Sequence, residues 1–279
     1  MCLIAWNWQP ASATPLLLIA NRDEFYARPA RALQWWDGGH ILAGKDLEAG
    51  GTWLGLTRAG RLAALTNYRD FSGAGKASQV PADAPSRGEL VTEFLNSDLS
   101  ASAFLQRLAS RAKHYNAFNL LVFDGTQLLG LQSRRAEIVV MHPGIGAVSN
   151  ADFHSPWPKL TWLSGELKTH IDTNPACGEA DSSVDAEALL STLKNDAIAP
   201  DDALPQTGLP LARERALSAA FIASPDYGTR ASSVVRIGRR QAEFVERSFD
   251  AHGELGTQRH RFLLGPGASA PIVVHDHAR

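Results

Sequence analysis

Apolar and polar positions follow one another in short runs near the start of the chain. The apolar run Cys2–Trp8 predicts a buried strand, residues 9–14 predict its turn, and residues 15–21 predict a returning strand. Antiparallel strands joined by a short loop bring their far ends together. We therefore expect an opening hairpin that places the polar tetrad at residues 21–24 beside the first residues of the chain.

Short apolar runs that alternate with Gly-rich turns continue up to residue 69 and predict further strands. These strands are expected at residues 41–44, 52–57 and 62–66. The small, polar segment 72–85 predicts a surface loop. Ser86 and Glu89 predict a capping box that starts a helix, and an amphipathic pattern predicts a second helix over residues 100–114.

The second half of the chain changes from strands to helices and back to strands. A meander of four strands is expected at residues 119–124, 127–133, 136–141 and 145–149. Helices are expected at residues 158–170 and 185–195, and closing strands at residues 230–237, 242–249 and 257–264. A polar tail begins at about residue 265. This order predicts an α+β fold in which helices pack outside antiparallel sheets.

Charge and cysteine content exclude several classes of protein. The 279 residues carry 27 basic and 29 acidic side chains, and a net charge of -2 leaves no electrostatic footprint for nucleic acid. A small-molecule partner is therefore favoured. Cys2 and Cys177 are the two cysteines, which excludes a disulfide framework or a Cys/His metal site and favours a reducing compartment, the cytoplasm. No apolar run reaches the length of a membrane span.

Cys2 is the first candidate for chemistry. Cysteine is small enough that an initiator Met1 in front of it is normally removed, which would leave Cys2 with a free α-amine beside its thiol. Such an amine titrates near neutrality, so it can accept the thiol proton without the help of a histidine. The alternative is a buried strand cysteine without chemistry, which is the usual fate of a lone free cysteine.

Two predicted strands end in asparagine. Asn67 follows the strand at 62–66, and Asn150 follows the strand at 145–149. An asparagine amide donates hydrogen bonds, and two such donors near an N-terminal thiol are what acyl-transfer chemistry needs to hold an oxyanion. Either side chain can instead cap a turn.

Several motifs carry a resemblance to a known family. They are Asn21-Arg22-Asp23-Glu24 with Phe25-Tyr26 and Arg28-Pro29, Gly51-Thr52-Trp53-Leu54-Gly55, Ala64-Leu65-Thr66-Asn67, Tyr115-Asn116-Ala117-Phe118-Asn119-Leu120 and Tyr227-Gly228-Thr229-Arg230. On these motifs the chain resembles the NRDE family, also called the transport and Golgi organisation protein 2 family. The resemblance spans nearly the full length and implies a single domain over residues 1–279. For this family, haem handling and acyl-CoA or lipid metabolism have been proposed.

A more distant resemblance is to N-terminal nucleophile hydrolases of the choloylglycine hydrolase and penicillin V acylase type. These enzymes begin Met-Cys, carry an Arg-Asn-x-Asp element on the second strand, and have asparagines after later strands. The resemblance implies a four-layer αββα sandwich of two antiparallel sheets. It also implies that Cys2 is the nucleophile, that Asp23 orients its amine, and that Asn67 and Asn150 hold the oxyanion.

The arginines of the chain match those enzymes less closely. Arg230 is similar to their late arginine, whereas Ala20 stands where their early arginine is found. Arg22 lies close along the chain and is the candidate to replace it. Because adjacent side chains of a strand face opposite ways, the direction of Arg22 decides whether it can favour the thiolate.

Two functions remain open at this point. The first is a cysteine hydrolase or acyltransferase for a small amide or acyl substrate, in which Asn21, Glu24 and Trp53 contact the substrate and neither a metal nor a cofactor takes part. The second is a non-catalytic carrier of the same fold that binds haem, acyl-CoA or a lipid. No Cys-x-x-Cys-His motif for haem attachment is present.

Overall fold

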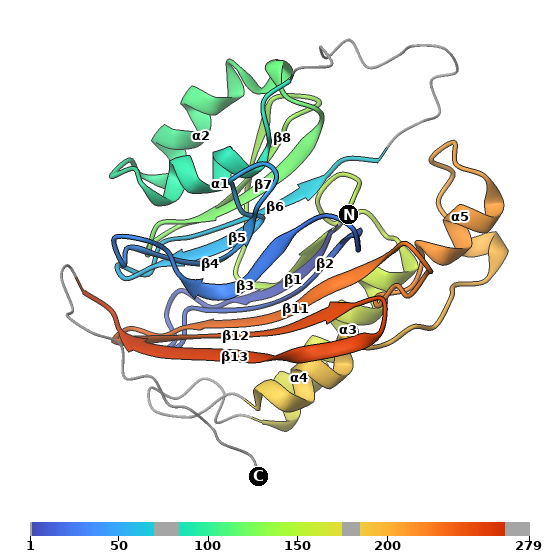
Figure 1. The fold of residues 1–279 in the computed structure, drawn as a ribbon. Helices are drawn as coiled ribbons and strands as arrows, with labels where there is room; N and C mark the ends of the chain where they lie inside the picture. The colour runs from blue at the N-terminus through green and yellow to red at the C-terminus, as the bar shows by residue number, and fades with distance from the viewer. Residues whose placement is uncertain (1, 70–83, 175–184, 266–279) are drawn as a thin grey trace.

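The computed structural model describes residues 2–69, 84–174 and 185–265. The expected loop at 72–85, Cys177 and the polar tail lie largely or wholly outside these residues. Two antiparallel sheets and a small set of helices make up the described part of the chain (Figure 1).

The first sheet, sheet A, joins the start of the chain to its end. Its strand order is β10-β1-β2-β11-β12-β13, and every neighbouring pair is antiparallel. The strands are β1 (Cys2–Trp8), β2 (Leu16–Phe25), β10 (Gly144–Val148), β11 (Tyr227–Ile237), β12 (Gln241–Asp250) and β13 (Gly253–Leu263).

The second sheet, sheet B, is built from consecutive segments of the first half of the chain. Its strand order is β3-β4-β5-β6-β7-β8-β9, again fully antiparallel. The strands are β3 (Ala30–Trp35), β4 (Ile41–Asp46), β5 (Leu54–Thr57), β6 (Leu62–Asn67), β7 (Phe118–Phe123), β8 (Leu128–Gln132) and β9 (Glu137–Val140).

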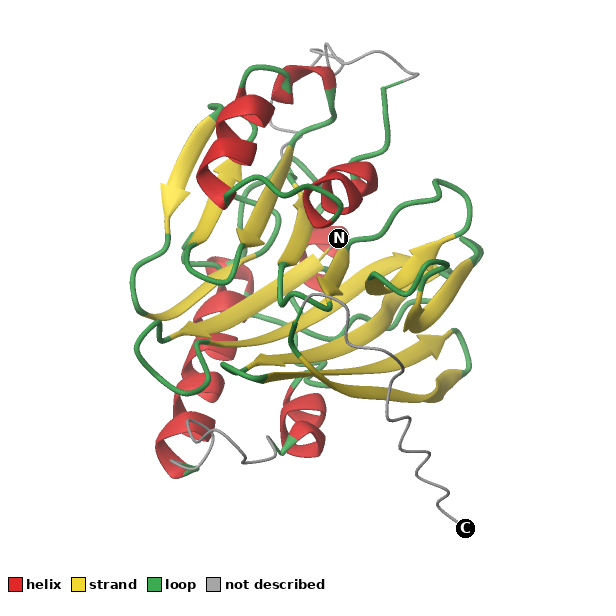
Figure 2. Cartoon of the chain, turned by 90° about the vertical axis from the view of Figure 1, so that its left-hand side faces the viewer, coloured by secondary structure: helices red, strands yellow, loops and turns green. Residues whose placement is uncertain are grey.

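Helices cover the outer face of each sheet, as Figure 2 shows in red above and below the strands. On sheet B, α1 (Gly88–Leu95) and α2 (Ala101–Ala109) pack Phe94 and Phe104 against the strands. On sheet A, α3 (Pro158–Thr173) and α4 (Ala186–Thr192) do the same with leucines. Within the described residues, two 3-10 helices, Ala112–His114 and Asp201–Ala203, and the short α5 (Leu211–Ala216) complete the helical segments.

The four layers follow from the two-residue period of the strands. In β1, Ile4 and Trp6 point into the core between the sheets, whereas Leu3 and Ala5 point to α3 and α4. Strands that are apolar on both faces can be buried on both sides. The expected α+β fold with four αββα layers is therefore confirmed.

Most expected elements are present, and three differ in an informative way. The hairpin of β1 and β2 forms as expected, although β2 continues to Phe25. The strand β3 was not expected. The predicted four-strand meander is wrong at its last member, because β10 leaves sheet B and pairs with β1 in sheet A.

The predicted capping box at the start of α1 is also wrong. The N-cap residue is Arg87, whose side chain makes no capping bond. Ser86 Oγ accepts from the Gly88 N–H at 3.3 Å, while the Glu89 carboxylate accepts from the Tyr115 hydroxyl at 2.6 Å. Glu89 therefore binds a tertiary partner rather than the local backbone, which the spacing alone did not indicate.

In the described ranges, no helix combines the length and apolar character needed to cross a membrane.

Candidate active site

An open cleft of about 460 Å³ lies where strand ends of the two sheets meet. Cys2 and Asp23 line it from sheet A, and Trp53 and Asn67 line it from the side of sheet B. Arg87, just before α1, completes this part of the wall. The fold thus brings together residues that are far apart in the sequence.

Cys2 faces the space between the sheets at the start of β1. It shares the interlayer core with Ala20, is among the residues that line the cleft, and is a free thiol. Ser149 Oγ donates to the Cys2 backbone oxygen at 2.9 Å and fixes the strand end. Burial raises the pKa of the Cys2 thiol, and the charge of Asp23 adds to this rise, while the charge of Arg22 opposes it. A thiol in this environment is protonated near neutrality and needs a base to react.

Arg22 faces Cys2 across the first strand pair. The register pairs Cys2 with Arg22. Arg22 lies two residues after Ala20, so the side chains of Arg22 and Ala20 point to the same side of β2, the side that faces the core between the sheets. The Arg22 Nη2 lies 3.5 Å from Asp46 Oδ2 and 3.8 Å from Glu24 Oε2. The direction that the sequence left open is therefore toward the cleft, where the guanidinium is shared between two carboxylates.

Asp23 is buried beside β11. Thr229 Oγ1 donates to Asp23 Oδ1 at 2.7 Å and accepts from the Ile222 N–H at 2.9 Å. The single hydroxyl proton is thus directed at the carboxylate. Burial raises the pKa of Asp23, whereas the positive charge of Lys159 and the bond from Thr229 oppose the rise. The Tyr227 hydroxyl donates to the Asp23 backbone oxygen at 3.2 Å, so β11 holds this residue at two points.

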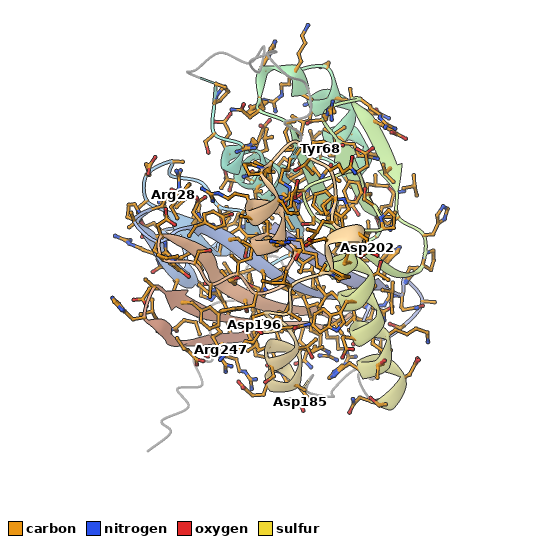
Figure 3. The ribbon with its side chains drawn as sticks, turned by 90° about the vertical axis from the view of Figure 1, so that its right-hand side faces the viewer. Arg28, Tyr68, Asp185, Asp196, Asp202 and Arg247 are labelled. Atoms are coloured by element: carbon orange, nitrogen blue, oxygen red, sulfur yellow. The ribbon has the colours of Figure 1, made fainter. Side chains whose placement is uncertain are left out.

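The two asparagines, Asn67 and Asn150, occupy different positions relative to the cleft. Asn67 lines the cleft at the end of β6, and Figure 3 labels Tyr68, the next residue. Asn150 is fully buried, and its Nδ2 donates to the Asn67 backbone oxygen at 2.8 Å. The Arg69 N–H in turn donates to the Asn150 backbone oxygen at 2.7 Å. Both amides were expected to donate to an oxyanion; in the structure Asn67 lines the cleft, whereas the Asn150 amide donates to the Asn67 backbone.

Arg230 is the extra residue of a β-bulge. Asp23 pairs with Thr229 and Arg22 pairs with Ala231, so Arg230 has no partner in the register of β2 and β11. The bulge leaves Arg230 in the cleft wall. Its guanidinium donates to the backbone oxygens of Phe25, Tyr26, Arg28 and Phe249. These neutral acceptors hold the side chain in place while leaving its charge available to the cleft.

Two of the three residues expected to contact the substrate line the cleft, namely Glu24 and Trp53. Asn21 does not, and this corrects the expected placement. It is fully buried on the helix side of β2, where its Nδ2 donates to the backbone oxygens of Leu193 and Ala220 at 2.9 and 2.8 Å. Asn21 therefore ties β2 to the segments that follow α4 and α5.

Three residues of the site were missed by the sequence analysis. Thr229 belongs to the Tyr227-Gly228-Thr229-Arg230 motif, so its place in that motif was the available signal. Arg87 lay inside the predicted capping box of Ser86 and Glu89, where nothing singled it out; it lines the cleft, and its Nη1 donates to the Ala117 oxygen at 3.2 Å. Lys159 lies within the expected helix at 158–170, and nothing local marks it as buried. Lys159 Nζ donates to the Leu217 oxygen, and this partner lies 58 residues away along the chain, so only the folded structure shows it.

The part of the chain that the structure describes holds no group of three or more His, Cys, Asp or Glu residues arranged to bind a metal ion.

The fold and the cleft define a class: a four-layer αββα protein with a cysteine at its second position facing a polar cleft. The chain belongs to the Transport and Golgi organisation 2 family, whose model matches residues 1–251. The chain is 36% identical over 266 residues to the Transport and Golgi organization protein 2 homolog of Bos taurus, covering 89% of this chain and 93% of that one. It is 34% identical over 268 residues to the human homolog, with the same shares covered.

A more remote relative is Transport and Golgi organization protein 2 of Drosophila melanogaster, 28% identical over 282 residues, with 91% of this chain and 95% of that one covered. The family expected from the motifs is thus confirmed.

Two solved structures are similar to the chain at low sequence identity. One is a Caenorhabditis elegans ortholog of N-acylethanolamine-hydrolyzing acid amidase, with a TM-score of 0.48, 10% identity, and 84% of this chain and 92% of that one covered. The other is the C2A mutant of a conjugated bile acid hydrolase from Clostridium perfringens, with a TM-score of 0.46, 8% identity and 88% of each chain covered. At such low identity, the chemistry of this chain has to be derived from the geometry of its own cleft.

Proposed function

We propose that the protein is an N-terminal cysteine hydrolase or acyltransferase that acts on a small amide or acyl substrate. The observation that carries this proposal is the position of Cys2, which lines an open cleft together with Arg22, Asp23 and Asn67. Removal of Met1 would create an α-amine on the same residue as the thiol. Because the thiol is held protonated by burial, such a neighbouring base is what the chemistry requires.

The proposed reaction has two halves. The Cys2 sulfur attacks the substrate carbonyl carbon, a carbon–sulfur bond forms, and the thiol proton passes to the α-amine. The carbonyl oxygen then carries the negative charge, and the bond to the leaving group breaks as the amine returns its proton to that group. Water, or a second nucleophile in a transferase, attacks the thioester and releases Cys2.

The surrounding residues have separate roles in this proposal. Asp23 stabilises the ammonium form of the amine, Arg22 favours the thiolate, and Arg230 adds positive charge to the cleft. Asn67 donates to the oxyanion, and Asn150 holds the Asn67 backbone in place. Loss of one oxyanion donor, as in Asn67→Ala, is expected to cost about 2.7 to 4 kcal/mol of transition-state stabilisation.

The shape and charge of the cleft favour a substrate with polar groups. Arg28, labelled in Figure 3, donates from Nε to Asp46 Oδ2 at 2.7 Å. Asp46 therefore interacts with two arginines of the cleft wall, Arg28 and Arg22. Glu24 and Trp53 line the same opening and are proposed to contact the substrate.

A second candidate is a non-catalytic carrier that uses this cleft for haem, acyl-CoA or a lipid. The cleft of about 460 Å³ favours this candidate, because its volume lies within the range of small-molecule binding pockets. A carrier needs neither Met1 removal nor a reactive Cys2, and this separates the two candidates.

The deciding experiment is the intact mass of the purified protein before and after brief treatment with a chloroacetamide probe. Peptide mapping compares the labelling of Cys2 with that of Cys177, which serves as the internal reference. The hydrolase proposal expects loss of Met1 and much faster labelling of Cys2. Retention of Met1 would leave no free α-amine on Cys2 and would overturn the proposal.

If Cys2 is reactive, a panel of chromogenic amides and thioesters is tested next, with Cys2→Ala as the matched control. Turnover that disappears in Cys2→Ala supports the hydrolase. Ligand binding that survives Cys2→Ala, without turnover, supports the carrier.

A further inference from the structure

Of the two asparagines expected to hold the oxyanion, only Asn67 lines the cleft. Asn150 is fully buried, and its Nδ2 donates to the Asn67 backbone oxygen at 2.8 Å. An oxyanion accepts several hydrogen bonds, and it is stabilised by donors that are aimed at it before the reaction begins. A second protein donor therefore has to come from another part of the cleft wall.

The guanidinium group of Arg87 lies beside Asn67 because the two segments share one hydrogen-bond acceptor. Arg87 Nη1 donates to the Ala117 oxygen at 3.2 Å, and the Tyr68 N–H donates to the same oxygen at 2.9 Å. Tyr68 directly follows Asn67, the last residue of β6. The shared oxygen thus holds the guanidinium next to the backbone that carries the Asn67 side chain, and both Arg87 and Asn67 line the cleft with Cys2.

The main chain at Arg87 is fixed by backbone contacts. Helix α1 packs against β5 and β6 of sheet B (Figure 1). The Gly88 oxygen accepts from the Thr52 N–H at 3.4 Å, and a Cβ atom on Gly51 would lie 2.6 Å from the Gly88 carbonyl carbon. A donor that is positioned in this way needs no reorganisation when negative charge develops in front of it.

Most hydrogen-bond donors of Arg87 remain available to a ligand. A guanidinium group has five N–H donors. Within the described ranges, Ala117 provides the only acceptor for the Arg87 side chain, and no carboxylate forms an ion pair with it. Burial lowers the pKa of Arg87, and the negative charges of Cys2 and Glu24 oppose this. Negative charge on the Cys2 side of the cleft therefore stabilises the buried cation.

The other polar side chains of the cleft wall are less suited to this position. The Arg22 guanidinium is shared between Asp46 and Glu24. Arg230 is anchored to backbone oxygens of the loop that follows β2, on the side of sheet A. Asn116 lies on the side of sheet B, but it is exposed, and no hydrogen bond from the described residues fixes its side chain.

We propose that the Arg87 guanidinium is the second donor to the oxyanion, beside the Asn67 amide. This role rests on the function proposed above. When the bond between the Cys2 sulfur and the carbonyl carbon forms, the thiol proton passes to the α-amine and an electron pair of the carbonyl moves onto its oxygen. Arg87 and Asn67 donate to that oxygen. The oxygen returns the electron pair as the bond to the leaving group breaks, and the amine gives its proton to that group.

The test compares two probes that react with the same thiol. p-Nitrophenyl acetate acylates Cys2 through a tetrahedral intermediate with an oxyanion, and the release of p-nitrophenolate gives the rate. Chloroacetamide alkylates Cys2 at its CH₂ carbon as chloride leaves, so its carbonyl oxygen takes up no charge. The ratio of the two rates separates stabilisation of the oxyanion from the reactivity of the thiol. Peptide mapping locates both adducts, and Cys2→Ala gives the background rate from Cys177 and lysines.

Arg87→Met is expected to lower the rate of acylation about 10²- to 10³-fold relative to the rate of alkylation. Asn67→Ala is expected to show the same selective loss. Arg107→Met is the matched control, because Arg107 is exposed on α2, and it is expected to leave both rates unchanged. Circular dichroism checks the fold of each variant, and Arg87→Ala replaces Arg87→Met if the latter does not fold.

An unchanged ratio in folded Arg87→Met, or an equal loss of both rates, would overturn the role of Arg87. An equal loss would mean that Arg87 acts on the thiol and not on the oxyanion. A wild-type protein in which Cys2 is not acylated would contradict the proposed function, and the role of Arg87 would fall with it. A Cys2 that reacts with both probes at a ratio independent of Arg87 would contradict the role of Arg87 alone.

Discussion

At the scale of single residues, Glu246 shows how the fold changes the chemistry of a side chain. It lies on β12, three strands away from Cys2, and lines the cleft. Burial raises the pKa of the Glu246 carboxyl group to about 7, although the Leu33 N–H, which donates at 2.8 Å, and the charge of Arg22 oppose the rise. The folded protein therefore binds this proton more tightly than the unfolded chain does.

The raised pKa predicts a pH-dependent loss of stability. The stabilisation from Glu246 is fully present below the unfolded pKa of 4.5 and is lost as the pH rises through about 7. Over this window the wild-type free energy of unfolding is expected to fall by about 3 kcal/mol through this group. Glu246→Gln should lack this fall, as measured by urea unfolding at several pH values. Glu166→Gln, on the surface of α3, is the control, and parallel curves for Glu246→Gln and the wild type would contradict the prediction.

A neighbouring residue-scale feature is the anchoring of Arg230 to the backbone oxygens of the loop between β2 and β3. Because hydrogen bonds from a charged donor contribute about 1.5 to 3 kcal/mol, Arg230→Met is expected to loosen this loop. Hydrogen exchange of peptides covering residues 26–31 should become faster. Arg239→Met is the matched control, since Arg239 binds the Pro10 and Ser12 oxygens of a different turn. Unchanged exchange at 26–31 in Arg230→Met would rule the anchor out.

At the scale of elements, the contact between α1 and the β4–β5 connection depends on paired glycines. A Cβ atom on Gly51 would lie 2.6 Å from the backbone carbon of Gly88. Backbone atoms cannot rotate away as a side chain can, so α1 would have to move. Because Arg87 precedes α1 and lines the cleft, this contact also positions part of the site.

This contact gives a prediction with an internal control. Gly51→Ala is expected to lower the free energy of unfolding by about 1 to 3 kcal/mol through overpacking. Gly165→Ala, in the middle of α3 with no atom within 4 Å of the added Cβ, is expected to raise it by about 0.8 to 1 kcal/mol through helix propensity. Urea unfolding measures both, and equal effects of the two variants would show that the close approach is not limiting.

At the scale of the whole molecule, the Arg69–Glu214 ion pair joins the layers. Arg69 follows β6 of sheet B, whereas Glu214 belongs to α5, which leads into the segment beneath sheet A. The side chains are 2% and 5% exposed, so breaking the pair would remove a buried counter-charge from Arg69.

Glu214→Gln is therefore expected to lower the free energy of unfolding by about 3 to 5 kcal/mol. Asp201→Asn, which breaks the exposed pair of Asp201 with Arg215, is the matched control and is expected to change stability little. Thermal and urea unfolding compare the two. A similarly small effect of both substitutions would mean that the buried pair does not hold the layers together.

Local pattern predicted much of the fold. The first hairpin, the strands β7 and β8, and the helix α3 could each be predicted from their own residues. In each of them, neighbouring residues set the backbone conformation and decide which face is buried. The cysteine at position 2, Asp23 and the asparagine at the end of β6 were likewise visible, since each lies at a strand end or within a motif.

Only the tertiary structure decided how these parts meet. Four features depend on partners far along the chain. They are the pairing of β10 with β1 in sheet A, the bulge at Arg230, the hydrogen bond from Asn150 to the Asn67 backbone, and the burial of Lys159. Such contacts are chosen by the packing free energy of the whole fold, which no local pattern contains. The sequence by itself therefore determined most of the elements and the candidate catalytic side chains of this protein, and the long-range packing decided which of those side chains share the cleft and with what charge.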